Sequence, residues 1–122
     1  MDAKRKNIDW IGDAKRRLVN FPVAAKSVLT YAIYLAEIGG RHLDTKPLTG
    51  VGADEAVCDH DGNTFRAVYT VEIDNWVYVL HCFQKKSKKG TKTPKPDIDL
   101  IRKRLKEARA KHEREGRNFR KV

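Results

Sequence analysis

The stretch from Phe65 to Pro96, FRAVYTVEIDNWVYVLHCFQKKSKKGTKTPKP, decides the fold. Its alternating apolar residues predict two β-strands, over residues 64–73 and 76–84, joined by a compact turn at Asp74-Asn75. The second strand leads directly into a dense cluster of lysines. Because an unpaired ammonium group is costly to bury, we expect this cluster to face water or an anionic partner.

Two helices are predicted before these strands. Asp13 is positioned to cap a short helix over residues 14–19, and Pro22 suits the first turn of a second helix. Apolar residues at helical spacing give the second helix one broad apolar face, and Gly39-Gly40 ends it. We interpret Tyr31 and Tyr34 on this helix as packing residues. The N-terminal third is therefore predicted to be a helical hairpin.

The remaining segments complete the predicted arrangement. Residues 7–11 are a candidate edge strand, residues 41–52 are predicted to be a loop, and residues 55–60 a strand. Thr93-Pro94 is expected to begin a last helix with an apolar stripe. The predicted fold class is α+β, an N-terminal helical hairpin packed on a small antiparallel sheet with a C-terminal helix. We expect one domain over residues 1–112 and a basic tail over residues 113–122.

The composition indicates a small core under a strongly basic surface. The 122 residues carry a net charge of +10, and 34% of them are charged. This charge favours nucleic acid, the ribosome or another anionic surface as partner. No apolar run approaches the roughly 20 residues that cross a bilayer, and the N-terminus lacks the apolar segment of a secretory signal. We expect a cytoplasmic protein without a membrane partner, with Cys58 and Cys82 reduced, and with no metal site and no cofactor.

Strand alternation predicts which side chains share a face of the sheet. If Ile73 pairs with Trp76 across the turn, one face is the core. The residues predicted for this core face are Phe65, Ala67, Tyr69, Val71, Ile73, Trp76, Tyr78, Leu80 and Cys82. The opposite, less covered face is predicted to bring together Arg66, His81, Phe83 and Lys85. Such a set suits RNA, because cations bind phosphate, an aromatic ring stacks on a base, and imidazole transfers a proton.

Structural roles for the same residues stay open. Arg66 also fits an ion pair with Glu72 or Glu55 on the sheet surface. Taken alone, a strand histidine such as His81 is more often a hydrogen-bonded structural residue than a catalyst. The lysine cluster fits a solvated surface as well as a phosphate-binding loop.

Several motifs, in their order and spacing, resemble a known family. They are WIG at 10–12, AEIGG at 36–40, the Lys46-Pro47-Leu48 turn, Glu55, FRAVYTV at 65–71, and the ending HCFQKKSKK…TPKPDIDLIRKRL. Together they resemble the RelE/HigB superfamily of bacterial toxins, in particular its phage-derived host-inhibition branch. The resemblance extends from Ile8 to about Lys111.

The resemblance implies the toxin of a type II toxin–antitoxin system, an mRNA interferase that cuts messenger RNA, usually on the ribosome, and so inhibits translation and arrests growth. It implies a cognate antitoxin, often a helix-turn-helix protein. It implies metal-free attack of the ribose 2′-OH on the adjacent phosphate. Some relatives use a catalytic tyrosine or histidine near the C-terminus, where this chain has Phe119 and His112.

The resemblance also assigns roles to individual positions. It implies catalytic cations at Arg66, Lys85 and Lys86, to which we add His81 as a candidate general acid or base, since imidazole titrates near pH 6.5. The residues expected to bind messenger or ribosomal RNA are Lys46, Phe83, Lys88, Lys89 and Lys92.

Two other functions remain candidates. The chain also fits a non-enzymatic basic module that binds DNA or ribosomal RNA, with affinity that falls steeply with salt and with tolerance of an Arg66→Lys exchange. A third candidate is a protein-interaction module whose positive groove receives an acidic partner segment.

Overall fold

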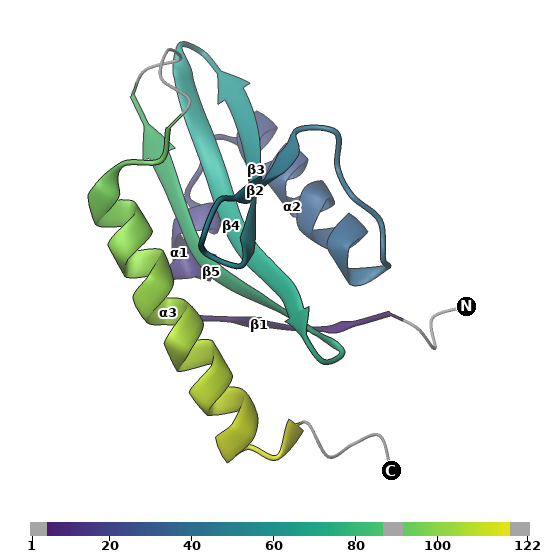
Figure 1. Cartoon of the computed structure of the whole chain (residues 1–122). Coiled ribbons are helices and arrows are strands. Elements are labelled where there is room, and N and C mark those ends of the chain that lie inside the picture. Colours follow the sequence, from purple (N-terminus) through teal and green to yellow (C-terminus); the bar gives the residue numbers. More distant parts are fainter. Residues whose placement is uncertain (1–4, 87–91, 118–122) are drawn as a thin grey trace.

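A computed structural model describes residues 5–86 and 92–117 and shows a five-stranded mixed sheet with helices on both faces (Figure 1). The elements in chain order are β1 (Asn7–Trp10), α1 (Ala14–Val19), α2 (Val23–Glu37), β2 (Thr45–Leu48), β3 (Ala53–His60), β4 (Asn63–Ile73), β5 (Trp76–Lys85) and α3 (Lys95–Arg114). The strand order is β1-β5-β4-β3-β2. β1 pairs with β5 in parallel, and the other neighbours are antiparallel.

This architecture corrects the predicted fold, an N-terminal helical hairpin on a small antiparallel sheet. The sheet is larger and mixed, because β1 adds a parallel strand beside β5 and β2 adds a strand at the other edge. The predicted edge strand over residues 7–11 is confirmed, whereas the predicted loop over residues 41–52 contains β2. Pro47 is tolerated in β2 because an edge strand needs no ladder donor on its outer side. α1 packs on β5 and α2 on β3 and β4, so each helix docks on its own part of the sheet.

Helices cover both faces of the sheet, and each face has its own apolar cluster (Figure 1). Beneath α1 and α2 the cluster includes Leu29, Ile33 and Tyr69. Beneath α3 it includes Ile101 and Leu105, part of the predicted apolar stripe. The face predicted to be less covered is therefore buried under α3 along β5, which corrects that expectation. The stripe alone predicts an amphipathic helix but does not say on which face of the sheet it packs.

The pairing of β4 with β5 contains two register shifts that cancel. Ile73 pairs with Trp76 as predicted, but one shift lies between Thr70 and Ile73 and the other between Val68 and Tyr69. Between the shifts the pairing is displaced by one residue, and from Leu80 back to the turn in β5, and at Ile73 in β4, side chains lie on the other face from the one predicted. The predicted core face is wrong for the residues that lie under α3 instead, namely Ile73, Trp76, Tyr78 and Leu80. Beyond the second shift the predicted register returns.

Two other sequence interpretations are tested by side-chain positions. Cys58 and Cys82 are free, as expected, and burial raises the pKa of the Cys82 thiol to about 12. Tyr31 and Tyr34 do not pack in the core: they are 54% and 41% exposed, which corrects their interpretation as packing residues.

Within the described residues no helix is both long and apolar enough to span a bilayer.

Asp13 fastens α3 to the N-terminal part of the chain. It stands at the cap position of α1 without the predicted capping hydrogen bond, and its carboxylate instead pairs with Arg17 at 2.9 Å and with Arg104 of α3 at 2.8 Å. These hydrogen bonds lower the pKa of Asp13. Gly12 has a φ of +59°, and a Cβ there would lie 2.7 Å from the Arg104 guanidinium carbon. The WIG motif thus provides a left-handed turn and room for Arg104.

Candidate nucleic-acid interface

Arg66 lies at the centre of a buried polar network. Its side chain is 2% exposed, and its Nη1 donates to both carboxylate oxygens of Glu55, at 3.3 and 3.4 Å. The same Nη1 donates to the hydroxyl of Thr93 at 3.3 Å, and that hydroxyl donates to Glu55 at 2.7 Å. Thr93 lies just before α3, so the network joins β3, β4 and the start of α3. The alternative of an Arg66–Glu55 pair is therefore correct, although the pair is buried rather than on the surface.

Strand register explains why the predicted residues come together. Arg66 lies directly opposite Phe83 on β5, and Thr64 lies opposite Lys85. One row further along, His81 is opposite Val68, which is opposite Glu55 of β3. Glu55 in turn lies opposite Lys46 of β2. The predicted grouping of Arg66, His81, Phe83 and Lys85 is confirmed as a matter of position, because it lies beyond the two cancelling register shifts.

Next to the network runs an open basic groove, which we call groove 1. It has a volume of about 800 Å³. Its lining residues are Lys85, Lys92, Thr93, Pro94, Lys95, Ile98, Asp99 and Arg102. The ammonium group of Lys85 donates to the backbone carbonyl of Lys92 at 3.0 Å, which holds this cation at the groove wall. Lys95 and Arg102 are exposed cations of α3 that sequence reasoning did not single out for RNA binding. Lys95 is the last residue of the lysine cluster that is predicted to face water or an anion, and Arg102 lies about two turns further along α3.

On the β2 side of Arg66 there is a second hollow, groove 2, of about 680 Å³. Its wall includes Lys46, His42, Thr64 and Arg66 itself, together with the acids Asp44 and Asp59. It exists because β2 pairs only with the first part of β3, which leaves the end of β3 as a free edge. The Nδ1 atom of His42 accepts a hydrogen bond from the Asp44 amide at 3.2 Å, so the neutral ring carries its proton on Nε2. Sequence reasoning attached no role to His42.

His81 and Phe83 are buried rather than exposed to either groove. Their rings stack with centroids 4.8 Å apart, and they are 2% and 4% exposed. The Nε2 atom of His81 lies 2.8 Å from an Asp97 oxygen on α3, and its buried Nδ1 has no hydrogen-bond partner among the described residues. Burial lowers the pKa of His81 below its ordinary 6.5, against the opposing effect of Asp97. Both rings therefore lie buried between the sheet and α3.

The other predicted site residues are distributed as follows. Lys46, Lys86 and Lys92 are exposed, and Lys85 is half-buried. Lys88 and Lys89 lie outside the described residues, as does Phe119. The described residues hold no group of three or more histidine, cysteine or acidic side chains arranged to bind a metal ion.

His112 lies near the C-terminal end of α3, whereas Arg66 contacts Thr93 just before its N-terminal end. Its Nδ1 is 2.8 Å from the Tyr78 hydroxyl, and its Nε2 is 2.5 Å from an Asp74 oxygen. Arg117 donates to the same hydroxyl at 3.0 Å and stacks over Trp76 at 4.0 Å. We call this group the C-terminal clasp, since it fastens the end of α3 to β5 and the β4–β5 turn. Neither groove includes any of these residues.

Comparison with known proteins identifies the family. The family model described as "Phage derived protein Gp49-like (DUF891)" matches residues 16–106, well over half of the chain. This range includes both grooves and the Arg66 network. Comparison with curated proteins and with solved structures gave no match. The chain belongs to the phage-derived Gp49-like family, which is associated with the toxins of toxin–antitoxin systems.

Proposed function

We propose that this Gp49-like chain is a toxin of the RelE/HigB type that cleaves messenger RNA, with the ribosome as its setting and a cognate antitoxin as its inhibitor. The observation that carries the proposal is the position of Arg66 between two open grooves. Its partner Thr93 lines groove 1, and Arg66 itself lines groove 2. A strand of RNA that follows the basic residues from Lys85 to Lys46 passes over this point.

The proposed reaction is transesterification within the RNA. The ribose 2′-OH attacks the adjacent phosphorus, the bond to the 5′-oxygen breaks, and the products are a cyclic phosphate and a 5′-hydroxyl. The attacking oxygen loses a proton and the leaving oxygen gains one, so no further reactant is needed. The phosphorane-like transition state carries extra negative charge, and the protein's cations stabilise it. One well-placed cation contributes on the order of 3 kcal/mol, or about a hundredfold in rate.

Burial of Arg66 determines how it takes part. In the described arrangement Nη1 divides its hydrogen bonds between Glu55 and the neutral hydroxyl of Thr93. A phosphate oxygen that replaces Thr93 exchanges a neutral acceptor for a charged one, and such hydrogen bonds are stronger. Lys85 supplies a cation that is already at the groove wall. In this proposal Glu55 orients the guanidinium.

The proton-transfer role proposed for His81 is weakened by its position. It is buried beneath α3 and engaged with Asp97. His42 is the histidine in groove 2 and offers an Nε2–H donor toward a phosphate oxygen. If neither histidine moves the proton, positioning of the 2′-OH by the ribosome supplies a large part of the rate.

A non-enzymatic basic module remains the second candidate, because one observation favours it. Arg66 and Glu55 are 2% and 0% exposed, so the exposed part of the site consists mainly of lysines. Lysines bind phosphate as point charges without any chemical step. Such a module binds RNA with a steep salt dependence and forms no product.

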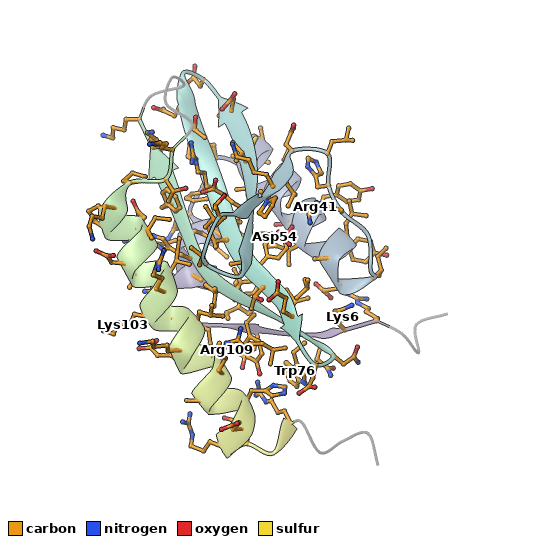
Figure 2. All side chains as sticks on the ribbon, viewed as in Figure 1. Lys6, Arg41, Asp54, Trp76, Lys103 and Arg109 are labelled. Atoms are coloured by element: carbon orange, nitrogen blue, oxygen red, sulfur yellow. The ribbon has the colours of Figure 1, made fainter. Side chains whose placement is uncertain are left out.

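Inducible expression in a bacterial host, followed by primer extension on abundant messages, separates the two functions. The test variants are Lys85→Ala and Arg66→Lys, which keeps the buried charge but removes the planar fork. Lys103→Ala is the matched control, since Lys103 is an exposed cation on the outer side of α3 (Figure 2). We expect growth arrest and discrete cuts with the wild type and the control, and about a hundredfold less cleavage with each test variant.

Intact messages in every strain would reject the enzyme, provided that the purified wild-type protein still binds RNA in a salt-dependent manner. Full cleavage by Arg66→Lys would reject the role given to the guanidinium. If Lys103→Ala lost as much cleavage as Lys85→Ala, the activity would depend on total positive charge rather than on groove 1.

A further inference from the structure

The exposed large hydrophobic side chains of the described residues are confined to one part of the molecule. All of them lie between Val19 and Leu43, a region that includes the whole of α2. Val23, at the start of α2, is 73% exposed. Large apolar side chains gathered on a surface, unlike isolated ones, mark interaction sites.

Four of these six side chains lie along one side of α2, together with two polar residues. Helical spacing places the following residues on one side: Val23, Ser27, Thr30, Tyr31, Tyr34 and, at the C-terminal cap, Ile38. We call this strip the α2 outer face. None of the exposed positions of α2 carries a charge, since its lysine is half-buried and its glutamate is buried. A helix at the surface of a chain that is 34% charged normally has a charged outer side, so this absence is unusual.

The aromatic residues of the α2 outer face are held in place before any partner binds. The rings of Tyr31 and Tyr34 stack with centroids 6.4 Å apart, and the His42 ring packs edge-on against Tyr31 at 6.1 Å. A shallow hollow of about 560 Å³ lies along Lys26, Ser27, Thr30 and the two tyrosines. Ordered aromatic residues lose little conformational entropy on binding, which favours their use as anchors.

The charges around the strip indicate the kind of partner. Lys26 lines the hollow, and the guanidinium of Arg5 lies 5.3 Å from the centre of the Tyr34 ring. Glu37, the partner of Arg5, is buried. Asp44, an exposed acid that follows Leu43 in the chain, lies in the wall of groove 2. The exposed charges around the strip are therefore mainly positive. A second copy of the chain would bring another net charge of +10, so electrostatic repulsion disfavours self-association.

We propose that the α2 outer face binds an acidic amphipathic helix of a different protein. The apolar side of that helix packs against Tyr31 and Tyr34, and its carboxylates pair with Lys26 and Arg5. This inference is separate from RNA cleavage, since the residues of the α2 outer face line neither groove, although His42, which packs against Tyr31, lies in the wall of groove 2. A partner bound here leaves groove 1 open, since α2 and α3 cover opposite faces of the sheet (Figure 1).

The test uses the full chain and a fluorescein-labelled synthetic amphipathic helix of leucine and glutamate, with binding followed by anisotropy at physiological salt. A peptide with lysine in place of glutamate is the control for charge. We expect the acidic peptide to bind, and the double variant Tyr31→Ser/Tyr34→Ser to bind it at least about tenfold more weakly. Ser27→Glu places a negative charge on the strip and should also weaken binding of the acidic peptide, without removing an aromatic ring.

The pair Lys85→Ala/Lys92→Ala is the matched control in groove 1 and keeps full peptide affinity if the inference is correct. Loss of peptide binding in this pair, or unchanged binding in the tyrosine variant, would overturn it. So would a tyrosine-dependent dimer in sedimentation, which assigns the strip to a second copy. Tyrosine-dependent binding of an oligo-uridine strand without peptide binding would assign it to single-stranded RNA.

Discussion

The two ends of α3 both cover buried polar groups on the same face of the sheet, yet they differ in their surroundings. At the N-terminal end the Arg66–Glu55–Thr93 network lies between two grooves with basic residues in their walls. At the C-terminal end the clasp of Tyr78, His112 and Asp74 adjoins neither groove. A buried histidine bound to an aspartate and a tyrosine suggests catalysis when viewed alone. The comparison teaches that access to a charged groove, and not the polar cluster itself, indicates a site.

The largest expected effect comes from Arg66→Ala. Removing the guanidinium leaves the Glu55 carboxylate buried without its cation, and breaking such a pair costs about 3–5 kcal/mol. Urea unfolding of the purified proteins measures this loss. A double variant Arg66→Ala/Glu55→Ala should lose less than the sum of the single variants, because neither charge is then left alone. Additive losses would show that the pair is not coupled. This stability cost is why Arg66→Lys, rather than Arg66→Ala, is the variant for the cleavage assay.

At the other end of α3, His112→Ala should destabilise the fold by about 1–3 kcal/mol. It removes one hydrogen-bond partner of the Tyr78 hydroxyl, which keeps Arg117, and the histidine partner of Asp74. Because the clasp is remote from both grooves, RNA cleavage per folded molecule should not change. Urea unfolding and cleavage assayed well below the melting temperature provide the two readings. Unchanged stability with lost cleavage would assign the clasp, and not only the groove end of α3, to the active site.

Between the two ends, His81 should make stability depend on pH. Burial lowers the pKa of His81 in the folded state below 6.5, so the unfolded chain binds a proton more readily. The stabilising contribution of the neutral ring is complete above about pH 6.5 and is lost as the pH falls through the lowered folded value. Urea midpoints at several pH values across this window should fall less steeply for His81→Gln than for the wild type. Parallel curves for the two proteins would exclude His81 as the source of the dependence.

The smallest effect on stability is expected from Lys95→Ala in groove 1. Its ion pair with Asp99 is exposed on both sides, and such pairs contribute less than about 0.5 kcal/mol. RNA affinity should nevertheless fall, with a shallower salt dependence, because one phosphate-binding cation is lost. Filter binding at several salt concentrations measures this change. Unchanged RNA affinity would place the RNA away from groove 1.

Sequence reasoning recovered the local parts of this molecule. Period-two alternation located the strands around Asp74-Asn75, and helical spacing located α2 and α3. It also grouped Arg66 with Phe83 and Lys85, since two register shifts cancel before that point. It missed the shifts themselves, because an extra residue in one strand is invisible in an alternating pattern. It missed His42 and groove 2, because these depend on where the short β2 stops along β3.

By itself the sequence determined the elements other than β2, the basic surface and the site candidates, because propensity, periodicity and charge are properties of neighbouring residues. Only the tertiary structure decided that Asn7 lies beside Trp76, that α3 covers the face holding Arg66, and that Tyr31 and Tyr34 face outward. These outcomes depend on contacts between residues far apart in the chain. An apolar stripe must be buried somewhere, but its partner is chosen by the packing of the whole sheet.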